Sequence, residues 1–223
     1  MVTARKMPAW SFSSLTAYET CPRQYLHTRV LKSVVEPQGE AAALGEKMHK
    51  QLEERALGRA PLPALTQHLE SIVAQIVARP GKLLVEQQLA ITAGLEPCDW
   101  WDKAAWCRGI VDIGVVGHSR GFMGDWKTGK RKPGSTQLML FAALGMQHYP
   151  ELERVTSTFI WTQSGKLDTE MFTRKQLPDI WGEFMPRVYR MGLAFEHDRW
   201  PARPSGLCRK WCAVRVCEFN GQR

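Results

Sequence analysis

Two aspartates and a lysine stand close together in the middle of the sequence, at Asp112, Asp125 and Lys127. The aspartates interrupt two short apolar stretches, residues 110–116 and 122–126, which are separated by a polar, glycine-containing turn. This pattern predicts a β-hairpin. Alternation along a strand places Asp125 and Lys127 on one face, and antiparallel pairing can bring Asp112 beside them. The cluster predicts a site for a hard divalent cation such as Mg²⁺, because carboxylate oxygens are its preferred ligands.

The lysine adds a second chemical capability, since a partly buried ammonium can orient a metal-activated water or help to deprotonate it. An isolated Asp-x-Lys sequence is common, however, and its ordinary explanation is a solvated sheet face followed by a basic turn. More than an isolated motif is present here. Gly109 begins the first stretch, Gly124 precedes Asp125, and the run Asp-Trp-Lys-Thr-Gly-Lys at 125–130 is complete.

These residues resemble the core of the PD-(D/E)XK nuclease superfamily, specifically its branch of RecB-type and CRISPR-associated adaptation nucleases. The resemblance implies that Asp112 and Asp125 bind the metal and that Lys127 is the catalytic lysine. It also implies an α/β fold with a restriction-endonuclease-like core. We expect a central mixed β-sheet of four or five strands, flanked by helices, with the active site where the two middle strands diverge.

A helix is predicted for residues 40–57, which are rich in helix-forming residues and carry apolar residues at helical spacing. Gly45 and His49 are four residues apart and share a face of this helix. On the sequence alone, His49 is as easily a packing residue as a ligand. The pattern Leu-Gly-x-x-x-His resembles the family's helix that supplies a histidine to the metal site, with the glycine permitting close approach. The resemblance therefore implies that His49 is a metal ligand.

A further acid, Glu86, lies inside the strand predicted for residues 83–91, after a helix expected over 64–78. The ordinary explanation is a charge that faces outward. The family has a glutamate on this strand near the active site, so Glu86 is included among the catalytic candidates.

Six cysteines are present, and four of them resemble a ligand set. Cys21 lies in a run, S-x-S-S-L-x-x-Y-x-x-C-P-x-x-Y, that resembles the N-terminal signature of the same nucleases, where the cysteine belongs to a metal-sulfur site. Cys208, Cys212 and Cys217 are spaced at four and five residues near the other end. The resemblance implies a [4Fe–4S] cluster that joins the N- and C-terminal ends. A four-cysteine Zn²⁺ site and unmetallated thiols remain alternatives. The other two cysteines, Cys98 and Cys107, match no ligand pattern.

Three residues are candidates for DNA contact. Gln137 begins a helix expected over 136–149 and matches the first position of the family's Q-x-x-x-Y motif, although Phe141 replaces the tyrosine and removes its hydroxyl. Trp100 and Trp101 end a stretch expected to be a loop. Exposed tryptophans can stack on unpaired bases, while adjacent tryptophans in a strand more often place one ring in the core.

Composition limits the class of partner. The 223 residues carry a net charge of +8 and a pI near 9.3, which favours a polyanion such as DNA. No apolar run approaches the roughly 18 residues of a membrane span, and the first ten residues lack the apolar core of a secretory signal. We expect a cytoplasmic protein, in the host cytoplasm if phage-encoded. A single nuclease domain is predicted over 1–223, with a helical part (1–80), a catalytic core (81–172) and a terminal helix with the cysteine block (173–223).

Together these observations predict a DNA exonuclease that requires Mg²⁺ or Mn²⁺ and acts on DNA ends in recombination, repair or phage replication, with an unknown protein partner. Two alternatives remain at this point: a structure-specific endonuclease, and a non-catalytic module that binds DNA ends or single strands. A non-catalytic module would be expected to lose part of the set Asp112, Asp125 and Lys127. All three are present, which favours catalysis.

Overall fold

The computed structural model describes residues 5–36, 39–131 and 135–221. The chain forms two compact units: the larger comprises residues 39–181, and the smaller comprises the residues up to 38 together with those from 182 onward. The prediction of one nuclease domain over the whole chain stays a prediction. All of the acidic site candidates fall in the larger unit, whereas the four cysteines of the predicted cluster fall in the smaller one.

The larger unit is built on a six-stranded sheet with the order β2-β1-β3-β4-β5-β6. Its strands are β1 (Lys82–Thr92), β2 (Pro97–Cys98), β3 (Ala105–Val116), β4 (Arg120–Lys127), β5 (Arg154–Trp161) and β6 (Lys166–Thr173). Only the β4/β5 pair is parallel, and the other four pairs are antiparallel. The predicted mixed sheet is therefore confirmed, with six strands instead of four or five. The additional strand is β2, a two-residue edge segment within the stretch expected to be a loop, too short to show alternation in the sequence.

Three helices pack on this sheet: α3 (Glu40–Ala56), α4 (Glu70–Val77) and α5 (Gln137–His148). Phe122 belongs to an apolar cluster with residues of α3 and α4, whereas its neighbour Met123 contacts Gly145 of α5. Consecutive strand residues point to opposite faces, so α5 covers the face opposite to α3 and α4. The helix expected over 64–78 is shorter than predicted, because a turn and a 3₁₀ segment (Gln67–Leu69) precede it.

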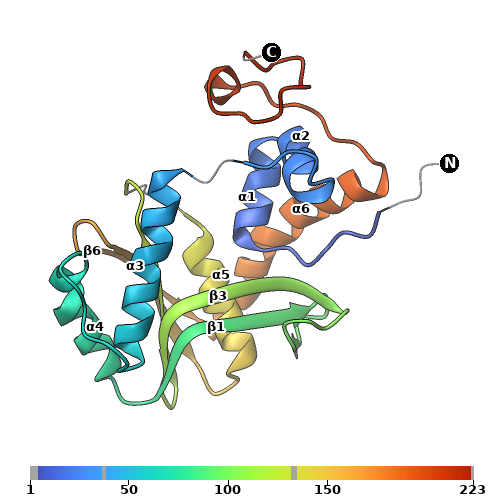
Figure 1. Ribbon diagram of the computed structural model, residues 1–223. Helices are drawn as coiled ribbons and strands as arrows, with labels where there is room; N and C mark the ends of the chain where they lie inside the picture. The colour runs from blue at the N-terminus through green and yellow to red at the C-terminus, as the bar shows by residue number, and fades with distance from the viewer. Residues whose placement is uncertain (1–4, 37–38, 132–134, 222–223) are drawn as a thin grey trace. The chain divides into compact units, whose positions relative to one another are not determined.

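The alternation of side chains along β3 is interrupted near Asp112. As a result, residues that regular alternation would place on one face of the sheet pack against helices on opposite faces. Gly109 packs against Leu144 of α5, whereas Ile113 belongs to the cluster under α3 and α4. Strict alternation would place both residues on the same face. Glu86, which the register places opposite Asp112, has a φ of +47°. A left-handed residue interrupts the pleat, and we attribute the change of face to it. Figure 1 shows β1 and β3 as long, strongly curved ribbons.

A glycine brings α3 close to the end of β4. A methyl group added at Gly45 would lie 2.9 Å from Oγ1 of Thr128, which follows β4 in the chain. This contact agrees with the expectation that the glycine permits close approach. Because His49 lies one turn further along α3, the same contact sets how near its ring comes to the sheet.

The smaller unit is helical. It contains α1 (Phe12–Thr20), α2 (Pro22–Tyr25), a π-helical turn (Leu26–Val30), the part of α6 (Leu177–Glu196) from residue 182 onward, and a 3₁₀ turn (Gly206–Arg209). The sequence predicts two short helices broken near Cys21 and Pro22, and this break is confirmed, since α1 ends at Thr20 and Pro22 begins α2. The Glu19 carboxylate accepts two hydrogen bonds of 2.7 Å from Arg187, which ties α1 to α6 within this unit.

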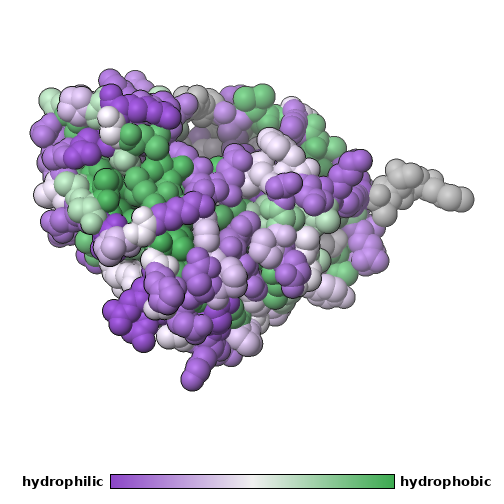
Figure 2. All heavy atoms as spheres, turned by 90° about the horizontal axis from the view of Figure 1, so that it is seen from below, coloured by the Kyte–Doolittle hydropathy of each residue, from purple (hydrophilic) through white to green (hydrophobic). Residues whose placement is uncertain are grey.

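The face of the molecule drawn in Figure 2 is mostly hydrophilic, and hydrophobic residues gather mainly toward one side of it. Within the described ranges no helix is both long and apolar enough to cross a membrane.

Candidate metal centre and active site

The predicted site lies where β3 and β4 separate. Their pairing ends at Ile113 and Gly124, while β4 continues beside β5 as far as Lys127. Asp112 and Asp125 are the next residues on the two strands, so their carboxylates stand at the point of divergence. Oδ2 of Asp112 accepts a 2.8 Å hydrogen bond from the backbone N–H of Trp126. The Asp112 carboxylate thus accepts from the Trp126 N–H, which would have bonded to a backbone carbonyl of β3 if the two strands had stayed paired.

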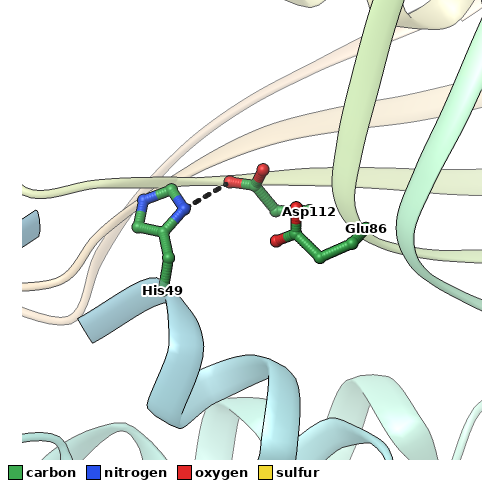
Figure 3. A group of neighbouring side chains, drawn as sticks. All are labelled: His49, Glu86 and Asp112. Atoms are coloured by element: carbon green, nitrogen blue, oxygen red, sulfur yellow. Dashed lines mark ion pairs between the residues drawn. The ribbon is translucent and has the colours of Figure 1, made fainter. Parts of the chain in front are cut away.

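Three side chains meet beside this point (Figure 3): His49 from α3, Glu86 from β1 and Asp112 from β3. Potential ligand atoms of the three lie within 4.8 Å of one another, and no other trio of His, Cys, Asp or Glu among the described residues meets that condition. Nδ1 of His49 is 3.5 Å from Oδ2 of Asp112. The structure therefore brings together three of the predicted site residues from three separate elements.

The imidazole of His49 is held by a backbone group. Its Nε2 lies 2.9 Å from the carbonyl oxygen of Trp126, and a carbonyl can only accept, so Nε2 carries the proton. In the neutral ring, Nδ1 then presents its lone pair toward Asp112. Burial lowers the pKa of His49, which favours that neutral form. This is the arrangement of a metal-ligating histidine, whose second nitrogen is oriented by a hydrogen bond.

Glu86 occupies an unfavourable backbone conformation for a residue with a side chain. Its φ of +47° lies in the left-handed region, which costs about 1 to 3 kcal/mol for a non-glycine residue. Burial, and after it the charges of Glu53 and Asp125, raises the pKa of Glu86. The strain is consistent with a requirement for the carboxylate at this position. The Glu86 carboxylate is turned toward His49 and Asp112, unlike an ordinary outward-facing charge.

Asp125 is engaged differently from Asp112. Its Oδ2 lies 2.5 Å from Nζ of Lys127, and its Oδ1 accepts a 3.3 Å hydrogen bond from the amide of Gln137 at the start of α5. The Lys127 ammonium also lies 5.0 Å from the centre of the Phe159 ring. Gln137, predicted to contact DNA, thus holds a carboxylate of the site, and its DNA contact stays a prediction.

Burial is the main reason that the pKa values of the site's carboxylates are raised. Burial, and after it the charge of Asp125, raises the pKa of Asp112 to about 8. Burial also raises the pKa of Asp125, against the opposing effect of the Lys127 ammonium. A divalent cation would neutralise this concentration of charge. The donor set of one neutral imidazole and several carboxylate oxygens fits such an ion, and the imidazole suits Mn²⁺ better than Mg²⁺.

A cavity of about 450 Å³ opens beside the trio of His49, Glu86 and Asp112. It is lined by Gly45, Glu46, His49, Lys50, Glu53 and Glu86. Lys50 and Glu53 belong to no motif in the sequence, although their helical spacing from Glu46 and His49 indicates that they share this face. Lys50 forms ion pairs with Glu53 at 2.9 Å and with Glu54 at 3.1 Å.

Comparison with known proteins agrees with the geometry. The family model described as "PD-(D/E)XK nuclease superfamily" matches residues 9–218. The chain belongs to this superfamily. No curated protein matches it. Among solved structures, one named as a "Putative exonuclease" from Eubacterium rectale has a TM-score of 0.53 and 11% identity, covering 96% of this chain and 88% of its own. A crystal structure of SSO0001 has a TM-score of 0.49 and 14% identity, covering 98% and 90%.

Membership of the PD-(D/E)XK superfamily implies a metal-dependent nuclease, with a candidate ion site at the His49, Glu86 and Asp112 trio. The likeness to the Eubacterium rectale protein supports the fold. The roles of the individual residues stay predictions.

The four cysteines of the predicted cluster share the smaller unit of this PD-(D/E)XK protein. Cys212 is near enough to the other three for their charges to raise its pKa, although burial is the larger cause. Backbone N–H groups of Arg203 and Ser205 approach the sulfurs of Cys21 and Cys208, at 3.5 Å and 3.4 Å. Among the described residues, however, no three cysteine sulfurs lie within 4.8 Å of one another. The remaining cysteines, Cys98 and Cys107, belong to β2 and β3 of the larger unit.

The two adjacent tryptophans contact an arginine instead of the core. The guanidinium carbon of Arg108 lies 5.4 Å from the ring centre of Trp100 and 5.5 Å from that of Trp101. Trp100 is half-buried, whereas Trp101 is 80% exposed. The alternative that one ring sits in the core does not describe this pair. Their predicted stacking on DNA bases stays a prediction.

The raised pKa of Asp112 predicts a pH-dependent stability of the metal-free protein. An aspartate with a higher pKa when folded than when unfolded stabilises the fold fully below about pH 4, and this contribution is lost as the pH rises through about 8. Asp112→Asn keeps an acceptor for the Trp126 N–H and removes the charge. In EDTA at pH 8.5, we expect the variant to melt about 4 °C or more above the wild type, with the difference shrinking as the pH falls and disappearing only near pH 4.

Thermal denaturation monitored by circular dichroism checks this expectation. Added Mn²⁺ should raise the melting temperature of the wild type and have little effect on Asp112→Asn. A variant that melts below the wild type in EDTA at pH 8.5 would show that the buried charge is not a source of instability.

Proposed function

We propose that this chain is a Mg²⁺- or Mn²⁺-dependent deoxyribonuclease that hydrolyses phosphodiester bonds from DNA ends. The observation that carries the proposal is the arrangement at the strand divergence. There, Asp112 and Asp125 are buried side by side, His49 and Glu86 face Asp112, and Lys127 contacts Asp125. Burying carboxylates together is unfavourable unless a cation or a proton compensates for their charge. A metal-dependent reaction explains why the fold retains them.

One or two divalent ions would be held by His49, Glu86 and Asp112, together with Asp125. When bound, such an ion polarises the scissile phosphate and lowers the pKa of an attacking water. The hydrogen bond from His49 to the Trp126 carbonyl keeps Nδ1 available for this purpose. Asp125 is already oriented by Gln137, so its carboxylate needs little rearrangement to take part.

Lys127 supplies the remaining charge. Its Nζ is placed by the Asp125 carboxylate and the Phe159 ring, and its side chain is only 30% exposed. From there the ammonium can donate hydrogen bonds to the attacking water and to the phosphate oxygens on which negative charge develops. Such placement is worth most where water is excluded, as it is beside two buried aspartates.

Preference for DNA ends follows from the form of the site. Lysine and arginine contacts hold a phosphate backbone without reading sequence, so selectivity must come from geometry. In this proposal a free strand end enters the cavity of about 450 Å³ beside the trio, and an intact duplex does not. The resemblance also suggests action in recombination, repair or phage replication in the cytoplasm, with an unknown protein partner.

Lys127→Ala tests the catalytic assignment. We expect cleavage of end-labelled linear DNA in Mn²⁺ to fall about 100-fold or more, because an interaction made in the transition state is lost. DNA binding should be nearly unchanged, since phosphate contacts come from many basic side chains. Lys130→Ala removes the same charge from the exposed end of the same segment and should retain full activity.

Asp112→Ala and Asp125→Ala should also abolish cleavage and leave DNA binding intact. Full activity in Lys127→Ala, or in both aspartate variants, would contradict the assignment. Binding by the wild type without any cleavage would favour the non-catalytic module.

The preference for ends predicts different rates on different forms of DNA. Linear duplex should be degraded quickly, closed circular duplex slowly, and both reactions should weaken steeply with added salt. Gel electrophoresis of matched linear and closed circular plasmid in Mg²⁺, Mn²⁺ or EDTA measures this. Rapid conversion of relaxed circles into discrete fragments would instead identify a structure-specific endonuclease.

We also propose that Cys21, Cys208, Cys212 and Cys217 bind one [4Fe–4S] cluster in the smaller unit. Two observations support this proposal. Backbone N–H groups approach the sulfurs of Cys21 and Cys208, as is favourable for cluster ligands. The charges of Cys21, Cys208 and Cys217 act on Cys212, so the four thiols lie in one region. Since no three described cysteine sulfurs lie within 4.8 Å of one another, their spacing does not choose between a cluster and Zn²⁺.

Protein purified without oxygen should therefore be brown and contain iron and sulfide. Cys212→Ser should remove the colour and lower the melting temperature. Cys98→Ser, which changes a cysteine of the larger unit, should do neither. Metal analysis by mass spectrometry and the visible spectrum provide the measurement. Colourless wild-type protein with one zinc per chain would establish the zinc alternative.

A further inference from the structure

An arginine of β3 lies along the same strand as the metal-site aspartate and faces the same way. Gly109 packs against Leu144 of α5, so the flanking residues Arg108 and Ile110 point to the opposite face of the sheet. Asp112 contacts His49 of α3, on the side away from α5. Arg108, Ile110 and Asp112 therefore follow one another along a single side of β3.

Arg108 is a cation held by aromatic rings. Its guanidinium lies against the rings of Trp100 and Trp101, and its Nε is enclosed without a hydrogen-bond acceptor. Within the described part of the chain, no carboxylate forms an ion pair with it. Two other arginines of the same unit differ: Arg55 pairs with Glu70, and Arg131 pairs with Asp168. An arginine that is fixed by stacking and keeps its outer N–H groups free is suited to bind an external anion.

Most of the Trp101 side chain is exposed to solvent. It is 80% exposed although it contacts Arg108. Between this residue and the metal site, the strand surface is also open, since Ile110 is 37% exposed and its cross-strand neighbour Gln88 is exposed. An exposed ring beside an unpaired guanidinium has the chemistry of a nucleotide site, in which a base stacks and a phosphate is bound.

The spacing along the strand fits a short length of DNA. Arg108 and Asp112 are four residues apart, which is about 13 Å along a strand. A stacked DNA strand advances about 3.4 Å per nucleotide, so this distance spans about four nucleotides and fewer if the strand is extended.

We propose that Arg108 and Trp101 form a subsite for a single-stranded segment of the DNA substrate. Arg108 binds a backbone phosphate and Trp101 stacks on a base, a few nucleotides from the bond cleaved at Asp112. The substrate class is DNA with an unpaired end, because bases in a duplex are stacked on one another and offer no face to a side chain. This inference rests on the proposed nuclease function, and it adds the form of DNA that the site accepts.

Two substrates distinguish an effect on binding at the subsite from an effect on hydrolysis at the metal site. Thymidine 5′-p-nitrophenyl phosphate offers one nucleotide and reaches the metal site alone, whereas a single-stranded 20-mer reaches both. With Mn²⁺, we expect Trp101→Ala and Arg108→Ala to raise KM for the 20-mer about 5- to 150-fold, as for loss of a stacked base, and to leave kcat nearly unchanged. Hydrolysis of the nucleotide ester should be unaffected. Trp101→Phe should recover much of the lost affinity.

Arg120→Ala is the matched control for Arg108→Ala. It removes the same charge from an exposed position at the start of β4, beyond the turn that joins the far end of β3. We expect a change in KM of less than about twofold, because a distant surface charge contributes little.

A second measurement locates the stacked base. A set of 20-mers carries one abasic nucleotide at each of the first six positions from either end. In the wild type, one or two of these positions should weaken binding as much as Trp101→Ala does, and in Trp101→Ala the same positions should have no further effect. Fluorescence anisotropy in EDTA provides the affinities.

The outcomes distinguish the subsite from the nuclease function. If Trp101→Ala leaves the affinity for the 20-mer unchanged, or lowers hydrolysis of the nucleotide ester by the same factor, the subsite is wrong. If the wild type hydrolyses neither substrate, the nuclease function is wrong, while anisotropy still decides whether Trp101 and Arg108 bind a single strand.

Discussion

The central constraint on this structure is the burial of several carboxylates close together where β3 and β4 diverge, which repel one another and lose their hydration. Asp112 and Asp125 are 8% and 6% exposed, and Glu86 lies opposite Asp112 on β1. Without compensation, charges buried so near one another would be strongly destabilising. Three features of the fold reduce that effect: the Trp126 N–H donated to Asp112, the Lys127 ammonium beside Asp125, and protonation favoured by raised pKa values. A divalent cation bound at these carboxylates would relieve the repulsion that remains.

Much of this arrangement could be predicted from the sequence because it is local. The two aspartates and the lysine lie within 16 residues of one predicted hairpin, and alternation alone relates Asp125 to Lys127. The mixed sheet and the break at Cys21 followed from β-rich stretches and proline rules of the same short range. His49 was harder to predict, because a histidine on an amphipathic helix has no local signal for its role, and only the resemblance indicated it.

The features that could not be predicted depend on how distant segments meet. The left-handed conformation of Glu86 changes which face of β1 and β3 packs on α5, and no glycine or asparagine marks it in the sequence. The hydrogen bond between Gln137 and Asp125 joins the start of α5 to the end of β4. The contact of Arg108 with Trp100 and Trp101 likewise needs the loop after β2 to fold back onto β3.

The change of face at Glu86 connects the two parts of the site. Below that point, β3 presents Ile113 to α3 and α4, which buries the strand and anchors the helix that carries His49. In the part of β3 that precedes Asp112, the same side of the strand is not covered by α3 and α4, and it presents Arg108 and Ile110 outward. A regular strand would keep one side buried along its whole length, so it could supply either the anchor or the open surface. The strain at Glu86 allows a single strand to supply both, with Asp112 at the junction.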